Sequence, residues 1–586
     1  MKKLLVFLKD YKKETVLAPL FKMLEAGFEL FVPLVMAAVI DRGIAQEDIP
    51  YVLKMGLVLV MLGLIGLTCS ITAQYFAAKA AVGFSTQLKH SLFEHIQELS
   101  FSEMDKLGTS TMITRMTSDA NQVQNGVNMV LRLFLRSPFI VFGAMVMAFT
   151  IDVKAALVFV VTIPLLSIVV FGIMMITMPL YKKVQAGLDK VLGKTRENLT
   201  GVRVIRAFHK EEQETAEFEQ DNSALTHLQL FVGKISALTN PVTYIIVNVA
   251  TIVLIYTGAV RVDTGYITQG EVVALVNYMS QILIELVKLA NLIITITKAL
   301  ACANRIQSVF ELQSSMAWKG SGDGLAEAGR SLTVSGQDEA GKSALPYAVE
   351  FDQVGLTYQG AGAESLSDID FKVKKGETIG IIGGTGSGKS SLVHLIPRFY
   401  DASRGSVRID GKDVREYGME ELRDKIGMVM QKAVLFQGTI RENLSWGKPD
   451  ATTEEMNWAL EISQAKEFVD TKPRGLEELI AQGGKNLSGG QRQRLTIARA
   501  VVRQPEILIL DDSASALDYA TDARLRKAIR EMGEGTTVFI VSQRTSSIQY
   551  ADQIIVLEDG RVAGIGTHEE LLESCEVYQE IHYSQA

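Results

Sequence analysis

The sequence predicts an all-helical membrane domain followed by a soluble domain in which helices alternate with strands. Six apolar stretches of membrane-spanning length occupy the first half of the chain, whereas the second half carries apolar runs of strand length around glycine-rich loops. Hydrophobic residues make up 48% of the chain and the mean hydropathy is +0.19, yet 21% of the residues are charged. A membrane half joined to a soluble half accounts for both values.

The length and the local composition predict where the domains meet. At 586 residues the chain is too long for one hydrophobic core. Between residues 313 and 346 the composition shifts to Gly, Ser, Ala and charge, and hydrophobic periodicity is lost, as is typical of a linker. We therefore predict a membrane domain at 1–312, a linker at 313–346 and a soluble domain at 347–586.

The six apolar stretches are predicted to be spanning helices, because each approaches or exceeds the roughly 20 residues that a bilayer requires. The short turns between them are acidic or neutral, whereas the segments 82–127 and 181–235 are long and basic. Basic segments stay on the cytoplasmic side, so we expect these segments and both termini to be cytoplasmic. The expected spans are 15–40, 51–81, 128–150, 153–180, 236–262 and 271–300.

Charge and cysteine content argue against two classes of function. A formal net charge of −7 and a pI near 5.7 argue against nucleic acid as a main partner. The cysteines, Cys69, Cys302 and Cys575, lie far apart in different segments. They therefore indicate neither a disulfide framework nor a metal site.

A glycine-rich loop, GGTGSGKSS, follows the apolar run GETIGII and precedes a helical pattern. Glycines leave the loop without side-chain bulk, so its backbone N–H groups can turn toward phosphate oxygens at the start of a helix. Lys389 is expected to reach the terminal phosphates, and the Ser390 hydroxyl to ligate Mg²⁺. The residues predicted to bind a nucleoside triphosphate here are Gly383, Gly384, Thr385, Gly386, Ser387, Gly388, Lys389, Ser390 and Ser391.

Two later motifs indicate the kind of nucleotide-binding domain. The segment LSGGQ precedes a helix, and ILILDD has the apolar residues of a buried parallel strand that ends in carboxylates. In this order the motifs resemble the ATP-binding cassette (ABC) family. The resemblance covers essentially the whole chain and implies a six-helix exporter transmembrane domain fused to an α/β P-loop nucleotide-binding domain.

In that family two nucleotide-binding domains sandwich two ATP molecules, and each signature loop completes the partner's site. The resemblance assigns the signature to LSGGQ and the same role in trans to Asp518, in the motif SALD that begins at Ser515. The signature residues are Leu487, Ser488, Gly489, Gly490 and Gln491.

The resemblance also implies roles around this chain's own nucleotide. Tyr358 is expected to stack on adenine. Gln431 and Asp511 are expected to join Ser390 around Mg²⁺. Coupling helices, which transmit motion between the domains, are expected near Gly108–Ser118 and Phe208–Glu219.

Two positions depart from the family pattern. Hydrolysis in the family relies on a glutamate directly after the Mg²⁺-binding aspartate and on a histidine in a later switch loop, whereas here these positions are Asp512 and Gln543. Asp512 holds its carboxylate about one carbon–carbon bond farther from the attacking water, and Gln543 can donate a hydrogen bond but cannot relay a proton. We therefore expect this chain's site to bind ATP well and to hydrolyse it poorly.

An intact signature beside a degenerate site resembles one subunit of a bacterial heterodimeric exporter, whose partner subunit carries the Glu and the His. Multidrug efflux across the plasma membrane is the role expected by resemblance, with peptides and lipids as alternative substrates. Two other interpretations stay open. The chain could form a homodimeric exporter with a slow site, or serve as a nucleotide-gated channel or regulatory subunit.

Charged residues recur at helical spacing inside three predicted spans. Charges in hydrocarbon are costly, so they are expected to face one another or a water-filled cavity. They could recognise polar or cationic substrates, or they could form packing ion pairs, with Glu25 joined to an arginine of the third span and Glu285 joined to Lys288. The charged residues are Glu25, Glu29, Arg132, Arg136, Glu285 and Lys288.

Overall fold

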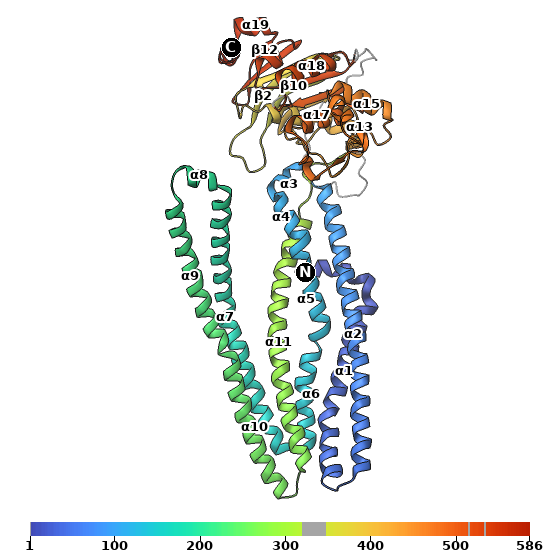
Figure 1. The fold of residues 1–586 in the computed structure, drawn as a ribbon, viewed down its shortest axis with the longest axis vertical. Helices are drawn as coiled ribbons and strands as arrows, with labels where there is room; N and C mark the ends of the chain where they lie inside the picture. Colours follow the sequence, from blue (N-terminus) through green and yellow to red (C-terminus); the bar gives the residue numbers. More distant parts are fainter. Residues whose placement is uncertain (1, 319–346, 514–515, 533–534, 586) are drawn as a thin grey trace, which may run out of the picture. The chain divides into compact units, whose positions relative to one another are not determined.

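The chain forms two compact units, which we describe separately (Figure 1). The first unit comprises Met1–Gln97 and Gly108–Leu312, and the second comprises Glu98–Leu107 and Gln313–Ala586. The computed structural model describes residues 2–318, 347–513, 516–532 and 535–585. Residues 319–346 of the predicted linker, and Ser515 of the SALD motif, lie outside the described residues.

The first unit contains, within the described residues, six helical segments that are long and apolar enough to cross a membrane. Each of them includes one of the six stretches expected from the sequence, so the prediction of six spans is confirmed. The segments are Leu4–Ile44, Ile49–Glu98, Thr109–Ile151, Val153–Thr200, Glu211–Asp263 and Gln269–Phe310.

Caps mark several helix boundaries in this unit. The Asp152 side chain accepts a hydrogen bond from the Ala155 backbone N–H at 2.8 Å and so starts the fourth span. Thr268 and Glu271 form a capping box at the start of the sixth. The helices are η1 (Lys2–Tyr11), α1 (Lys12–Ala38), η2 (Val39–Ile44), α2 (Ile49–Glu98), α4 (Thr109–Thr114), η3 (Arg115–Asp119), α5 (Ala120–Leu133), α6 (Arg136–Ile151), α7 (Val153–Thr200), α8 (Val202–Ala207), α9 (Glu211–Ala237), α10 (Thr239–Asp263) and α11 (Gln269–Phe310).

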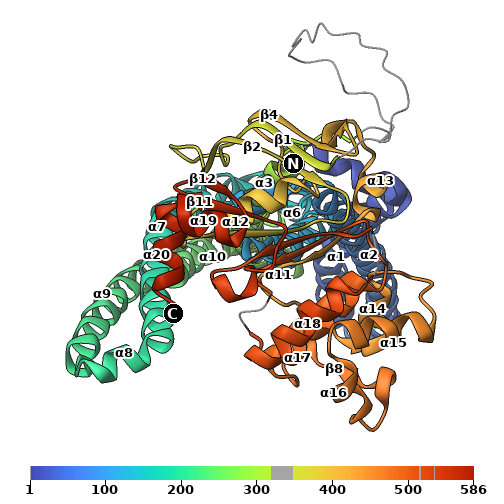
Figure 2. The ribbon, with the colours of Figure 1, turned by 90° about the horizontal axis from the view of Figure 1, so that it is seen from above.

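The fourth and fifth spans continue beyond their apolar parts as a helical hairpin. Helices α7 and α9 run side by side, and the short helix α8 joins them at the tip (Figures 1 and 2). The Phe208 and Val204 side chains at this tip are 71% and 61% exposed. The tip helix therefore ends just before the segment Phe208–Glu219 in which the sequence predicts a coupling helix.

A six-stranded sheet forms the centre of the second unit. The strand order is β12-β11-β3-β10-β9-β6, in which all neighbours are parallel except β12, which pairs antiparallel at one edge. The central strands are buried on both faces, which explains why TIGIIG, ILILD and TVFIV are continuous apolar runs. The strands are β3 (Thr378–Gly383), β6 (Ile426–Val429), β9 (Ile507–Asp511), β10 (Thr537–Val541), β11 (Gln553–Glu558) and β12 (Arg561–Gly566).

Antiparallel strands and short helices complete this unit. A four-stranded sheet has the order β2-β1-β4-β5, and β7 pairs with β8. Helices α14 to α17 lie together beside the main sheet (Figure 2). The remaining strands are β1 (Tyr347–Leu356), β2 (Leu366–Lys374), β4 (Arg404–Ile409), β5 (Lys412–Asp413), β7 (Gly438–Thr439) and β8 (Leu479–Ile480). The helices are α12 (Lys389–Leu395), α13 (Met419–Asp424), α14 (Ile440–Ser445), α15 (Thr453–Ile462), α16 (Lys466–Asp470), α17 (Gly489–Val501), α18 (Tyr519–Arg530), α19 (His568–Ser574) and α20 (Glu576–Tyr583), with single helical turns η4 (Val414–Glu416), η5 (Gly475–Glu477), η6 (Gln482–Gly484) and η7 (Thr545–Ser547).

The short helix α3 (Phe101–Leu107) belongs to the second unit although it lies within the membrane half of the sequence. The Phe101 and Phe399 rings lie 4.6 Å apart, and the Tyr400 hydroxyl donates to Asp105 Oδ2 at 2.6 Å. Gly108, with φ +72°, separates α3 from α4. Helix α3, which packs within the second unit, therefore precedes the segment Gly108–Ser118 in which the sequence predicts a coupling helix.

Candidate nucleotide-binding site

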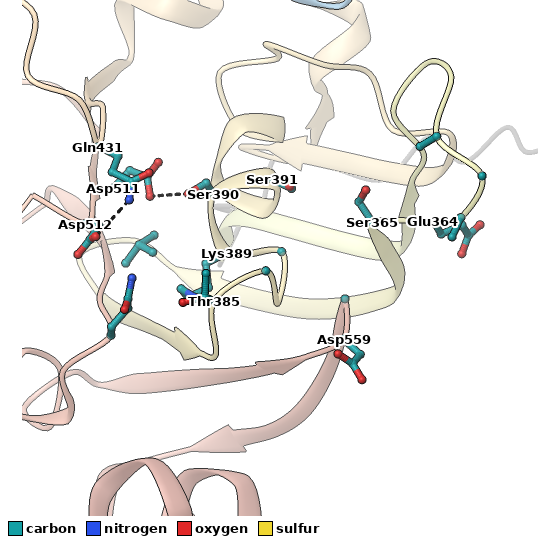
Figure 3. Close-up of a pocket in the computed structure, with 18 residues that line it drawn as sticks. Glu364, Ser365, Thr385, Lys389, Ser390, Ser391, Gln431, Asp511, Asp512 and Asp559 are labelled. Carbon is teal, nitrogen blue, oxygen red and sulfur yellow. Dashed lines mark hydrogen bonds between the residues drawn. The ribbon is translucent and has the colours of Figure 1, made fainter. Parts of the chain in front are cut away.

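The predicted site residues meet at one edge of the six-stranded sheet, around a cavity of about 710 Å³ (Figure 3). Parallel strands β3, β6, β9 and β10 all end at this edge, and the loop after each of them supplies side chains to the cavity. Such an edge is where open α/β sheets bind their ligands. The predicted residues that line it are Thr385, Gly386, Gly388, Lys389, Ser390, Ser391, Gln431, Asp511, Asp512 and Gln543.

The phosphate loop requires glycine where its backbone turns into α12. Gly386 and Gly388 have φ of +87° and +94°, values that favour glycine. A Cβ at Gly388 would also lie 2.7 Å from Leu366 Cδ2. Gly388 is the N-cap of α12 and provides no side-chain cap, so the first backbone N–H groups of the helix are available to a phosphate group.

Lys389 lies folded against the loop that precedes it. Its Nζ donates to the Gly383 and Gly384 carbonyl oxygens at 2.9 and 2.6 Å, and lies 3.4 Å from Ser387 Oγ. Burial lowers the pKa of the Lys389 ammonium, while the charges of Asp512 and Asp511 oppose that shift. A phosphate group bound in the cavity would therefore accept strong, charge-assisted hydrogen bonds from the Lys389 ammonium.

The donor set for Mg²⁺ is present at the ends of β3 and β9. Ser390 Oγ donates to Asp511 Oδ1 at 2.9 Å, and Asp511 is only 2% exposed (Figure 3). Hydroxyl, carboxylate and amide oxygens suit Mg²⁺, which keeps its other positions for water and phosphate. Ser390, Asp511 and the Gln431 amide oxygen would hold the ion, whose chemistry there is to neutralise charge on the phosphate oxygens.

Asp512 occupies the position of the family's catalytic glutamate. Hydrogen bonds of both its backbone and its side chain fix its position. Its backbone has φ +46°, and its N–H donates to the Val541 carbonyl at 3.1 Å. Its Oδ2 accepts a hydrogen bond from Gln431 Nε2 at 3.3 Å (Figure 3). Burial raises the pKa of the Asp512 carboxyl, whereas the hydrogen bond from Gln431 opposes this rise.

Tyr358 lies beside the cavity, where its side chain contacts Ser391 and Tyr400. Its hydroxyl donates to Ser391 Oγ at 2.9 Å, and its ring meets the Tyr400 ring edge-on at a centroid distance of 5.0 Å. The loop that follows Tyr358 lines the cavity instead, through Ala361, Gly362, Ala363, Glu364 and Ser365. The stacking of Tyr358 on adenine stays a prediction.

Four polar side chains at the site, those of Glu364, Ser365, Asp559 and His394, are not predicted from the sequence. Glu364 and Asp559 line the cavity on the side away from Asp511 (Figure 3). His394 Nε2 lies 3.6 Å from Asp511 Oδ2. The spacing of four residues between Ser390 and His394 places both on one face of α12 and could have indicated the histidine. Nothing local in the sequence marks Glu364 or Asp559, which reach the cavity from separate loops.

The signature segment forms the start of α17. Ser488 and Gln491 make a capping box, in which Ser488 Oγ accepts from the Gln491 N–H at 3.2 Å and Gln491 Oε1 accepts from the Ser488 N–H at 3.0 Å. Gly489 and Gly490 form the first turn, and Leu487 packs in the core. Among the described residues that line the cavity, none comes from this segment.

Asp518 caps the next helix, α18. Its side chain accepts hydrogen bonds from the Thr521 N–H and hydroxyl at 2.9 and 2.8 Å. These bonds hold the pKa of the Asp518 carboxyl below its usual range. Asp518 therefore has a structural role as an N-cap within this chain.

The charged residues of the spans form ion pairs in the first unit. Arg136 bridges Glu29 and Glu285 at 2.7 Å each, and Ser137 also donates to Glu285 at 2.8 Å. Lys288 contacts Glu285 at 2.8 Å, so the expected pairing of these two residues is confirmed.

The expected pairing of Glu25 with an arginine of the third span is wrong. Glu25 contacts Lys22, three residues earlier on its own helix, and Lys22 also donates to Ser70 at 3.1 Å. A partner within reach on the same helix face requires no long-range fit, which explains this choice. Among the described residues, Arg132 Nε has no hydrogen-bond acceptor.

The three thiols, Cys69, Cys302 and Cys575, are buried and unpaired in the described part of the chain.

Comparisons with known proteins identify the family. Residues 15–286 match the profile described as ABC transporter transmembrane region, and residues 366–515 match the profile described as ABC transporter. The chain is 36% identical over 584 residues to an uncharacterized ABC transporter ATP-binding protein of Mycobacterium tuberculosis, with 99% of this chain and 97% of the relative covered.

It is 32% identical over 582 residues to the putative multidrug export ATP-binding/permease protein YgaD of Bacillus subtilis, with 98% and 97% covered. Its fold matches that of a bacterial Atm1-family ABC exporter with ATP bound, with a TM-score of 0.77 at 22% identity and 98% of each chain covered. The chain therefore belongs to the ABC transporter family and is an ATP-hydrolysing, multi-pass membrane transporter of exporter architecture.

Proposed function

We propose that this chain is one half of a heterodimeric exporter in the cytoplasmic membrane, and that its own site binds ATP but hydrolyses it slowly. The observation that carries the proposal is the pair Asp512 and Gln543, which both line the ATP cavity. The Asp512 side chain is one carbon–carbon bond shorter than the family's Glu, and Gln543 cannot relay a proton as the family's His does. The nucleotide-binding unit and both termini are cytoplasmic in this proposal, because the long basic segments are.

The hydrogen bonds of Asp512 explain why its shorter side chain matters. Its N–H is bonded to Val541 at the end of the neighbouring strand, so the backbone at Asp512 is held at the sheet. A carboxylate retracted by about 1.5 Å, one carbon–carbon bond, leaves the window of roughly 2.6 to 3.2 Å in which a general base works. The Gln431 amide also donates a hydrogen bond to one oxygen of the Asp512 carboxylate.

The signature helix supports the part of the proposal that concerns the heterodimer. The capping box of Ser488 and Gln491 starts the 13-residue helix α17 with side chains of this chain alone. A complete signature that contributes nothing to its own cavity is useful only to a second nucleotide-binding domain. The partner subunit in this proposal carries the Glu and the His, and the signature of this chain completes the partner's hydrolytic site.

Closure of the two nucleotide-binding domains would reach the spans through the tip helices. In the second unit an apolar groove of about 1190 Å³ contains Phe436 and Trp446, whose rings stack at 4.4 Å. In the first unit the tip of the α7–α9 hairpin exposes Val204 and Phe208. The proposal assigns a part in the transmission between ATP binding and transport to each of these exposed apolar surfaces.

The ion-pair cluster of Arg136, Glu29, Glu285 and Lys288 is assigned a packing role rather than substrate recognition. Glu285 is 3% exposed and accepts three hydrogen bonds, from Arg136, Ser137 and Lys288, so it is already satisfied by the protein. The cluster joins α1, α6 and α11, and it adjoins the break at Phe134 and Leu135 between α5 and α6. Such a cluster fixes the packing of three helices.

Replacing Arg136 tests this role. Arg136→Ala leaves Glu285 without its central cation and should cost about 3–5 kcal/mol of stability, seen as a lower melting temperature in lipid nanodiscs. Lys288→Ala is the matched control, because the Lys288 side chain is 43% exposed and its loss should cost about 1 kcal/mol or less. A substrate-recognition role would instead abolish transport in Arg136→Ala without a change in melting temperature.

The substrate in this proposal is a drug-like compound, in keeping with the similarity to the putative multidrug export protein YgaD. The heterodimer is tested by ATP turnover of this chain purified alone and together with a half-transporter that carries Glu and His at the two positions. Turnover that appears in the pair and vanishes when the partner's catalytic Glu is replaced supports the proposal.

Brisk turnover by this chain alone, lost in Asp512→Asn, would contradict the proposal and favour the homodimer. ATP-gated ionic conductance instead of uphill substrate flux would favour the channel.

A further inference from the structure

The loop that follows β10, here called the switch loop and comprising Ser542–Ser547, is held from two sides. It carries Gln543, which lines the ATP cavity. On one side α18 contacts its far end, where Arg526 Nη1 donates to the Ser546 carbonyl at 2.6 Å and Ser547 Oγ lies 3.3 Å from Asp522 Oδ2. These contacts fix the end of the switch loop that is remote from the nucleotide.

On the other side the C-terminal segment contacts the part of the switch loop that enters the cavity. Gln585 Nε2 donates to the Gln543 carbonyl at 2.7 Å, and Gln585 Oε1 accepts from the Thr545 N–H at 2.9 Å. One side-chain amide thus bonds to backbone groups on both sides of Arg544, as a residue of a parallel neighbouring strand would. His582 Nδ1 lies 3.3 Å from Thr545 Oγ1 and adds a second contact from the same segment.

The segment that carries Gln585 is anchored independently of the switch loop. Tyr578 is fully buried in α20, and its hydroxyl lies 2.7 Å from His568 Nδ1 on α19. Gln579 Nε2 donates to the Leu572 carbonyl at 2.7 Å. The position of Gln585 is therefore set by α19 and α20, and loss of its amide removes contacts to the switch loop while these anchors remain.

We infer that Gln585 is a positioning residue for Gln543 and that it contributes to the preference of this site for ATP over ADP. Its amide holds the Gln543 carbonyl, and the orientation of that peptide group fixes the direction in which the Gln543 side chain enters the cavity. A glutamine amide there can donate a hydrogen bond to a terminal phosphate oxygen, and only ATP carries the third phosphate. The inference rests on the proposed role of Gln543 as that donor.

The test is equilibrium binding by the full chain in lipid nanodiscs, measured by calorimetry with Mg²⁺ and either ADP or the non-hydrolysable analogue AMP-PNP. Gln585→Ala should weaken AMP-PNP binding by about three- to tenfold, the size of one lost hydrogen bond, and should leave ADP binding within about twofold. Gln585→Glu keeps the acceptor for Thr545 but faces the Gln543 carbonyl with a carboxylate, so it should lose at least as much AMP-PNP affinity.

Glu580→Ala is the control, because it removes an exposed side chain from the same segment and leaves the Tyr578 and Gln579 anchors in place. It should change neither affinity. Equal weakening of AMP-PNP and ADP by Gln585→Ala, or an equal effect of Glu580→Ala, would overturn the inference in favour of general loosening.

Gln543→Ala separates the inference from the proposed function on which it rests. If Gln543→Ala lowers the preference for AMP-PNP while Gln585→Ala does not, Gln543 is the phosphate donor and the positioning role of Gln585 is wrong. If Gln543→Ala leaves the preference unchanged, the proposed role of Gln543 fails, and the inference falls with it.

Discussion

Two helix N-termini in the nucleotide-binding unit are built for opposite purposes. At α12 the phosphate loop ends in Gly388, which gives the helix no side-chain cap and leaves its first N–H groups for phosphate. At α17 the signature begins with Ser488 and Gln491, which cap the helix by themselves. The first backbone donors of α12 thus have no side-chain cap, whereas α17 is capped by its own side chains.

The phosphate-loop face and the signature face also differ in the residues that concern nucleotide binding and hydrolysis. The phosphate-loop face retains the lysine, the serine and the aspartate that bind nucleotide and Mg²⁺, but at the two catalytic positions it has Asp512 and Gln543. The signature face has no such substitution in LSGGQ. Under the proposed function, one unit keeps its contribution to a partner's site while its own site mainly binds ATP.

The largest expected effect comes from the phosphate-loop face. Lys389→Ala removes a buried cation whose loop-bound position faces the phosphates, so ATP affinity should fall by about tenfold to a hundredfold in a binding titration. Lys527→Ala, at a lysine whose side chain is 77% exposed on α18, is the control and should bind ATP normally. Normal ATP binding by Lys389→Ala would contradict the assignment of this face.

A substitution with an effect of intermediate size distinguishes the phosphate-loop face from the signature face. In the proposed heterodimer, Ser488→Ala should leave ATP binding at this chain's own site unchanged but lower hydrolysis about tenfold or more, because the proposal has the signature act on the partner's nucleotide. The lost cap should also cost about 1 kcal/mol of stability.

Thr452→Ala is the matched control for the cap, because Thr452 and Glu455 form the same kind of capping box on α15. It should cost similar stability and leave hydrolysis intact. Equal losses of hydrolysis in the two variants would mean that Ser488 acts through stability alone.

The smallest expected effect concerns pH at the C-terminal helices beside the phosphate-loop face. Burial lowers the pKa of His568, which lies against Tyr578. Between the folded pKa and the unfolded pKa of about 6.5 the unfolded chain binds the extra proton, so local stability is retained above that window and decreases as pH falls through it.

Hydrogen exchange at pH 7.5 and 5.5, corrected for intrinsic rates, checks this expectation. Helices α19 and α20 should lose protection at pH 5.5 relative to α17, and His568→Asn should remove the difference. Equal protection of α19, α20 and α17 at both pH values in the wild type would contradict it.

The sequence predicts what is local and misses what depends on distant partners. The six spans and the phosphate loop follow from apolar runs and glycine spacing, which act over neighbouring residues. The membership of α3 in the second unit depends on Phe101 and Asp105 meeting Phe399 and Tyr400, about 300 positions later, and no periodicity records such a meeting.

Prediction of the nucleotide-binding site from the sequence has the same limit. Ten of the predicted residues line the cavity because four parallel strands end at one sheet edge, a consequence of topology that the motif order implies. The bond between Gln431 and Asp512, and the contact of Gln585 with the switch loop, join segments that are far apart in sequence. Such contacts between separate loops require the folded structure.

The most direct test of the central claim is ATP turnover by this chain alone, compared between the wild type and the double variant Asp512→Glu with Gln543→His. Two copies of this chain can supply each other's intact signature, so restoring the base and the histidine should raise turnover by about 10²-fold or more. Asp512→Asn should remain at the wild-type level. No gain in the double variant, or a wild type that turns over ATP briskly and loses that activity in Asp512→Asn, would contradict the account.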